Sequence, residues 1–401
     1  MISTELQNLI ETLAEQLAAP AVIEDDEQQL IVHSAQSAPV DDVRRECILL
    51  RYTRPAVRDW FRQFGITTAQ EPLRIPPDPE RGILGRLCVP IDHHGARVGY
   101  LWLIDDQERL DDDAVAYAAK TASQVGLLIF DDILAERLAS GMLDHLLSPA
   151  AELRIESVRQ ITDSGLLSGN GEVIAIVAQP ASPSCQPDRS VIAESLRDVT
   201  RRRPPGEVMA LARNNQGVLV ARSAGRDLVA EARLLADALC QAMGRRIQAG
   251  EPGASSVVAG IGGPQATLAD AHLSYREGSQ AARVAATITA MGPIASWPEL
   301  GAYRTLAQLP MCEEVTASLD PRLVRLLRQC DPAVLATLEA YLDLAGDIKA
   351  TTERLNVYRG TLYYRLQKAE KLADVDLRNG QDRLALHLGF KLARLTGVYA
   401  G

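Results

Sequence analysis

The segment from Asp347 to Leu372 constrains this 401-residue chain most, because its pattern is typical of two short helices joined by a tight turn. A helix is expected over 349–355, a turn over 356–358 and a longer helix over 359–372. On the longer helix, apolar residues at spacings of four, three and four define an inward stripe of Leu362, Leu366, Ala369 and Ala373. At about 100° per residue, the outer face carries Gly360, Tyr364, Gln367 and Lys371. The segment therefore predicts a helix-turn-helix.

The charge of this segment differs from that of the whole chain. Between Arg354 and Lys368 there are four basic residues and no acidic one, although the formal net charge of the chain is -10. Guanidinium groups, hydroxyls and exposed helix N–H groups are what a helix needs to lie in a DNA major groove against phosphates. A solvated basic face on an ordinary helical hairpin is the alternative, and this stretch alone leaves both open.

A longer motif surrounds the predicted turn. Its matching positions are Thr337-Leu338, Tyr341-Leu342, Leu355-Asn356-Val357, Arg359, Thr361-Leu362 and Tyr364-Arg365-Leu366. Over about 335–395 the chain resembles the C-terminal DNA-binding region of the PucR/CdaR family of bacterial transcription regulators. It departs from the family pattern at Tyr358 and Gly360, where His and Asn are usual, and at Asp374, where Gly commonly ends the helix.

The resemblance implies double-stranded DNA as a partner. The candidate DNA-binding residues are Arg359, Gly360, Thr361, Tyr364, Arg365 and Lys368. Gly360 would let the backbone approach DNA closely, at a cost of about 1 kcal/mol in helix propensity. Arg365 lies on the inner shoulder of the helix, so a phosphate or an internal carboxylate is its expected partner.

Residues 1–130 are expected to form a separate α/β domain. Helices are predicted over 5–17, 43–64 and 112–130, with strands over 21–23, 29–33, 85–91 and 97–104. The central hairpin flanked by helices resembles a GAF-type sensory domain, which implies a small-molecule effector. The acidic run from Glu24 to Glu27 is predicted to be a solvated turn between two strands.

Aromatic residues gather in this domain, although they make up only 4% of the chain. The candidates for a ligand pocket are Tyr52, Trp60, Phe64 and Trp102, with Phe61 beside them. Ligand pockets are apolar with few polar groups, so the set fits one. For any single member a plain hydrophobic core is the favoured explanation, and the pocket is a hypothesis about the set.

Residues 131–149 are predicted to continue as a linker helix. Apolar residues recur every three or four positions at Leu127, Phe130, Leu134, Leu138, Met142 and Leu146. This stripe suits pairing with a second copy in a homodimer. It suits a helix lying on its own domain as well.

Residues 150–297 alternate strands and helices, which predicts an α/β sandwich with a mostly antiparallel sheet. The order resembles a GGDEF-like domain. The hairpin that would carry the cyclase signature reads Arg213-Asn214-Asn215-Gln216-Gly217, without a carboxylate to hold Mg²⁺. No enzymatic activity and no cofactor are therefore expected, and the glycines Gly260, Gly262 and Gly263 are interpreted as a tight turn.

A helical connector over 298–331 leads into an all-α domain over 332–401, whose last helix is expected to bury Leu384, Leu388, Leu392 and Leu395. No apolar run reaches the roughly 20 residues of a membrane span, and the N-terminus lacks signal-peptide features, so the expected location is cytoplasmic. Six scattered cysteines suggest no metal site and no disulfide framework.

Together these features predict a multidomain α+β protein that acts as a ligand-responsive, sequence-specific DNA-binding transcription regulator, with activation favoured by the family resemblance. Two alternatives remain. One is a GAF-containing signalling enzyme of the nucleotide-cyclase type. The other is a protein-interaction adaptor that uses Tyr363 and Tyr364 as partner contacts and does not bind DNA.

Overall fold

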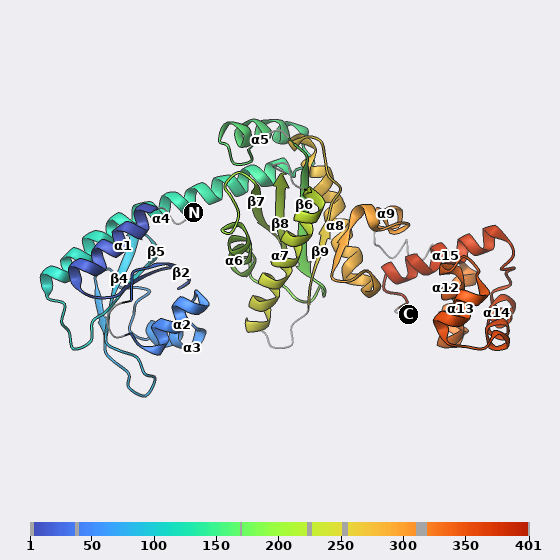
Figure 1. Cartoon of the computed structure of the whole chain (residues 1–401), viewed down its shortest axis with the longest axis horizontal. Helices are drawn as coiled ribbons and strands as arrows, with labels where there is room; N and C mark the ends of the chain where they lie inside the picture. Colours follow the sequence, from blue (N-terminus) through green and yellow to red (C-terminus); the bar gives the residue numbers. More distant parts are fainter. Residues whose placement is uncertain are drawn as a thin grey trace. The chain divides into compact units, whose positions relative to one another are not determined.

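The computed structural model describes residues 4–36, 40–168, 171–222, 227–250, 256–309 and 319–399. The chain divides into two compact units, Met1–Leu138 and Ala139–Gly401, and the course of each can be followed by colour in Figure 1. None of the described helices is long and apolar enough to cross a membrane.

The first unit contains a five-stranded antiparallel sheet in the order β2-β1-β5-β4-β3. The strands are β1 (Ala21–Asp25), β2 (Leu30–His33), β3 (Leu73–Ile75), β4 (Arg86–His93) and β5 (Ala96–Ile104). Side chains alternate along β5. Leu101 and Leu103 pack with α1 (Thr4–Leu17) and α4 (Asp112–Leu146) on one face. Tyr100 and Trp102 pack under α2 (Asp42–Leu50) and α3 (Pro55–Arg62) on the other.

Two predictions for this unit are wrong. The single helix over 43–64 is two helices, because Arg51 adopts a left-handed conformation (φ 66°) and Pro55 disfavours a helical residue before it. The acidic turn is only partly solvated, since Glu24 lies in β1 and is 3% exposed. The predicted strands of the central hairpin are confirmed as β4 and β5. The GAF-like assignment of this unit stays a prediction.

Helix α4 runs without interruption from Asp112 to Leu146, which confirms the predicted helical continuation. Its apolar stripe divides into two parts. Leu127, Leu134 and Leu138 are 50%, 44% and 56% exposed, whereas Leu146 is fully buried in the second unit's core. Leu127, Leu134 and Leu138 are therefore the exposed members of the stripe, whereas Phe130 packs against the core of the first unit.

The second unit begins with a five-stranded sheet in the order β10-β9-β6-β8-β7. The strands are β6 (Val173–Pro180), β7 (Val208–Arg213), β8 (Gln216–Arg222), β9 (Val257–Ile261) and β10 (Ile294–Ser296). Helices α6 (Arg189–Thr200) and α7 (Leu228–Gly250) cover one face, and α5 (Ala151–Asp163) and α8 (Ala271–Thr287) lie on the other. Only the β10–β9 pairing is parallel among the described strands, so the predicted sandwich is confirmed.

The glycines of this sandwich serve close packing. A Cβ atom at Gly260 would lie 2.0 Å from the Gly278 carbonyl oxygen, and one at Gly262 would lie 2.1 Å from that of Ser274. Helix α8 can therefore approach β9 only because both positions lack a side chain. Gly260 lies within β9 and not in the predicted tight turn, and the glycines serve the packing of α8 on this strand.

The rest of the second unit is helical. It contains α9 (Tyr303–Leu306), α11 (Pro321–Gln329), α12 (Pro332–Asp343), α13 (Ile348–Leu355), α14 (Arg359–Ala373) and α15 (Gly380–Leu395). The predicted inward stripe of α15 is wrong for Leu384 and Leu388, which are 53% and 40% exposed, whereas Leu395 is buried and Leu392 packs against the core as predicted. The helix also buries Leu386, Phe390 and Ala393 in the core that it shares with α12 and α14.

Candidate nucleic-acid interface

Local capping residues define the helix-turn-helix. The carboxylate of Asp347 accepts a hydrogen bond from the Ala350 N–H at 3.0 Å and begins α13. Asn356 ends that helix in the left-handed conformation (φ 49°), which Asn tolerates better than most residues. Tyr358 is then extended, and α14 starts at Arg359. The predicted helix, turn and helix are confirmed to within one residue at each boundary.

The two faces of α14 are as predicted. Its inward stripe of Leu362, Leu366, Ala369 and Ala373 is buried in the core shared with α11, α12 and α15. Its outer face of Gly360, Tyr364, Gln367 and Lys371 is exposed. Because one face is held by packing, α14 presents a rigid outer surface.

Four of the six candidate DNA contacts lie on this exposed surface: Arg359, Gly360, Tyr364 and Lys368. Thr361 is half-buried beside them. No side chain caps the N-terminus of α14, so its first N–H groups are not engaged by a capping side chain. Uncapped N–H groups at a helix N-terminus are ready donors to an anion such as a phosphate. This feature was not predicted, although Tyr358 at the capping position signals it.

Arg365 differs from the other candidates because it is engaged inside the protein. Its Nη1 atom donates a hydrogen bond of 3.1 Å to the hydroxyl of Thr337 on α12. That hydroxyl is fully buried and donates in turn to the Ala333 carbonyl at 2.6 Å. The partner is a hydroxyl rather than the carboxylate or phosphate expected. Arg365 thus ties α14 to α12.

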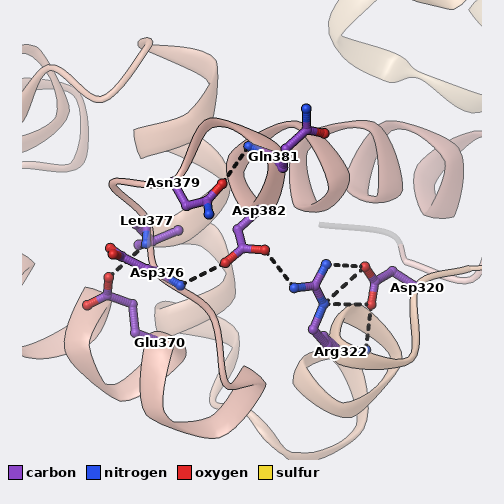
Figure 2. A network of polar contacts seen from close by, with 8 residues as sticks. All are labelled: Asp320, Arg322, Glu370, Asp376, Leu377, Asn379, Gln381 and Asp382. Atoms are coloured by element: carbon purple, nitrogen blue, oxygen red, sulfur yellow. Dashed lines mark hydrogen bonds and ion pairs between the residues drawn. The ribbon is translucent and has the colours of Figure 1, made fainter.

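A polar network holds the C-terminal end of α14 (Figure 2). Asp382 on α15 accepts hydrogen bonds from the Asp376 N–H at 3.0 Å and from Arg322 at 2.7 Å. The Asp376 N–H and Arg322 together lower the pKa of the Asp382 carboxyl. Glu370 of α14 accepts a hydrogen bond from the Leu377 N–H at 2.9 Å. The network connects α11, α14 and α15, so the outer face of α14 has a defined orientation within the helical region.

The aromatic candidates of the first unit do not share one pocket. Trp102 and Phe61 line a small cavity of about 10 Å³, with ring centroids 4.8 Å apart. Trp60 and Phe64 pack against each other at 4.9 Å and do not line this cavity. Tyr52 pairs with Gln29 in an isolated antiparallel β-bridge. The polar part of the cavity wall, which includes Glu24, Arg44 and Arg86, was not predicted.

The turn between β7 and β8 shows what replaces the cyclase signature. The Asn215 side chain donates a hydrogen bond to the Cys185 backbone carbonyl at 3.0 Å. The Gln216 side-chain amide donates one to the side-chain oxygen of Gln179 at 2.8 Å. Arg213 lies over the ring of Tyr275 at 5.4 Å. These amides and the guanidinium form internal contacts. Within the described ranges, no three His, Cys, Asp or Glu side chains gather as metal ligands.

Comparisons with known proteins support both parts of the second unit. Residues 334–392 match the PucR C-terminal helix-turn-helix domain, and residues 167–284 match the GGDEF-like domain.

Three bacterial regulators, all from Bacillus subtilis (strain 168), are similar to the chain. It is 22% identical to the proline-responsive transcriptional activator PutR, over 98% of this chain and 97% of that protein. It is 20% identical to the DNA-binding transcriptional activator AdeR, over 97% of this chain and 93% of that protein. A shorter match of 68 residues is 37% identical to the purine catabolism regulatory protein, covering 17% of this chain and 13% of that protein. The two domain matches, in this order along the chain, and the similarity to these regulators identify the protein as a transcription regulator of the PucR type.

Proposed function

We propose that this protein is an effector-responsive activator of transcription that reads DNA with α14. The observation that carries the proposal is the exposed outer face of α14, which combines basic and hydroxyl side chains with an uncapped N-terminus. The names of the PutR and AdeR relatives, both activators, support activation rather than repression. A regulator that acts on the bacterial chromosome belongs in the cytoplasm.

In the proposed complex, α14 lies in the major groove with its first turn toward the bases. Arg359 is suited to a bidentate contact with guanine, and Thr361 and Tyr364 offer hydroxyls to base edges or phosphates. Lys368, one turn further on, is placed for a phosphate contact. Gly360 allows the backbone of the first turn to approach the DNA. Arg365 takes part indirectly, because its contact with Thr337 orients α14.

For regulation we propose a homodimer. The exposed Leu127, Leu134 and Leu138 on α4 follow a seven-and-four spacing that suits a helix pairing with its twin. We assign residues 1–130 to a GAF-like sensory domain, 131–149 to the linker, 150–297 to the GGDEF-like domain, 298–331 to the connector and 332–401 to the DNA-binding domain. An effector in the sensory domain would change the spacing of two α14 helices on a repeated site.

Two other functions are less well supported. A nucleotide cyclase needs carboxylates at the β7–β8 turn, where this chain has Arg213 and amide side chains that make internal contacts. We propose that the GGDEF-like domain has a structural role. A protein-interaction adaptor would tolerate loss of Arg359 and Lys368. The DNA titration described next, with variants at these two positions, therefore also tests this alternative.

The test is a titration of DNA from the protein's own upstream region with the full chain, at several salt concentrations and with nonspecific competitor. Arg359→Ala should weaken specific binding by about 1–3 kcal/mol, because a base contact is lost. Lys368→Ala should weaken binding to all sequences and reduce the salt slope by about one.

Arg378→Ala is the matched control, since it removes a guanidinium that is exposed and paired with Asp376 outside α14. It should bind specific DNA like the parent. Unchanged binding by both α14 variants would reject the proposed reading helix. If the upstream region does not bind at all, selection from random DNA sequences with the full chain decides whether any specific site exists.

A further inference from the structure

The first unit contains a buried cluster of charged side chains beneath α2 and α3. Arg44 and Arg86 are 2% and 4% exposed, and Glu24 and Asp41 are 3% and 7% exposed. All but Asp41 line the cavity of about 10 Å³ between the sheet and the two helices. Charged side chains are rarely buried unless they are paired or bind something. The hydrogen-bond and ion-pair partners of each group therefore show whether the protein itself satisfies all four charges.

Three of the four charged groups have partners. The Asp41 carboxylate forms an ion pair with Arg86 and accepts the Leu84 N–H at 2.9 Å. Glu24 accepts hydrogen bonds from the Thr53 hydroxyl at 2.6 Å and from the Cys47 thiol at 3.0 Å. These contacts account for Glu24, Asp41 and Arg86 within the protein.

Arg44 is the exception. Its Nη2 atom donates to the Trp102 carbonyl at 3.3 Å, but its Nη1 atom is buried without a hydrogen-bond partner. Among the described residues, no carboxylate lies within ion-pair distance of its guanidinium. Burial, and then the neighbouring Arg86, lower the pKa of Arg44 to about 10, so the group remains a cation at neutral pH. Glu24 and Asp41 attract the Arg44 guanidinium from beyond ion-pair distance, but a buried cationic nitrogen without a hydrogen-bond partner is still unfavourable.

A second donor at the same cavity also lacks a partner. The indole Nε1 of Trp102 is buried and makes no hydrogen bond. Trp102 and Arg44 both line the cavity, and together they offer two unused N–H donors. Two donors beside an unpaired guanidinium match an acceptor that carries negative charge. Phe61 provides an apolar wall against the same space.

We infer that this cluster is the effector site, and that it takes a small molecule through its carboxylate, with Arg44 and Trp102 as the donors. The inference rests on the proposed function, in which the first unit is sensory. The present cavity has room for one water-sized group. A carboxylate therefore enters with one oxygen at this position, and the short helices α2 and α3 move outward to admit the rest.

The experiment measures the melting temperature of the purified full chain with acetate, lactate, succinate, benzoate and L-alanine, each compared with its amide. At least one carboxylate should produce a saturable rise of about 5 °C or more at about 100 times its Kd, while its amide does not. The same carboxylate should change tryptophan fluorescence, because Trp102 lies in the site.

Arg44→Met should abolish both responses. Arg45→Met is the matched control, because Arg45 is the next residue on α2 and its side chain is 60% exposed; it should respond like the parent. If Arg44→Met does not fold, Arg44→Lys should weaken the response about tenfold or more, since it keeps the charge but loses the planar fork of donors.

Two results would overturn the inference: carboxylates and amides that act alike, which leaves a buried water as the only occupant, or an Arg44 variant that responds like the parent. The DNA titration is also carried out on the same protein samples without any carboxylate, and its result is interpreted separately. Salt-sensitive specific DNA binding with no carboxylate response would reject this site and leave the proposed function standing.

Discussion

Replacing Gly360 with alanine should change stability and DNA affinity in opposite directions. Gly360 is the second residue of α14 and is exposed, and a Cβ atom there would meet nothing within 4 Å. The added methyl group therefore costs no contact in the free protein. It restricts the unfolded chain and improves helix propensity, which should raise the free energy of unfolding by about 0.5–1 kcal/mol. The melting temperature should rise by roughly 1–4 °C.

On DNA the same methyl group should be unfavourable. In the proposed complex the backbone of the first turn approaches the groove at Gly360, where no capping side chain engages the N–H groups. A methyl group forced into a close contact costs about 1–3 kcal/mol, which corresponds to a loss of roughly 5- to 150-fold in affinity.

Thermal denaturation and fluorescence anisotropy with labelled operator DNA at fixed salt measure the two effects. Gly380→Ala is the control, because Gly380 is also exposed in the first turn of its helix, α15, and a Cβ atom there would meet nothing within 4 Å. It should gain stability without losing DNA affinity. A Gly360→Ala protein that binds DNA as tightly as the parent would refute the close approach. A melting temperature of Gly360→Ala below that of the parent would refute the argument from helix propensity.

Three further predictions follow from single contacts. Asp374→Gly should stabilise the protein by about 0.5–1 kcal/mol in chemical denaturation, because Asp374 ends α14 in a left-handed conformation (φ 56°) that favours glycine; a loss would show that its side chain contributes a contact. Thr337→Val should cost about 1–3 kcal/mol in the same assay, since it removes the acceptor for Arg365; an unchanged midpoint would mean that water replaces the hydroxyl. Burial raises the pKa of Glu24 above its ordinary 4.5, so its proton stabilises the fold at low pH. The parent should therefore lose stability relative to Glu24→Gln as the pH rises above 4.5 through the folded-state pKa, and parallel curves of denaturation midpoint against pH would contradict this.

Local signals were sufficient for the helix-turn-helix. The inward stripe from Leu362 to Ala373 and the turn at Asn356 depend on residues within one or two helical turns of each other, so periodicity identified them correctly. The same reasoning was only half right for α15. Leu392 and Leu395 pack inward as predicted, but Leu384 and Leu388 are exposed, and Leu386 and Phe390 point into the core because α12 and α14 lie on that side.

The break between α2 and α3 could have been predicted, because Pro55 stands inside the helix that was expected over 43–64. The role of Arg365 could not, since its partner Thr337 is 28 residues away on another helix. The uncapped start of α14 was visible in Tyr358, whose side chain cannot take the place of Ser, Thr, Asp or Asn at a cap.

By itself, the sequence determined the α/β pattern of the middle of the chain and the helix-turn-helix with the exposed outer face of α14. Each depends on residue spacing within a single segment, which is set by the period of a helix or a strand. Only the tertiary structure revealed the buried charged cluster of the first unit. Glu24 was expected in a solvated turn, yet it lies buried with Arg44 and Arg86, which come from other segments. Burial and charge pairing between distant segments depend on which faces meet, and no local pattern encodes that.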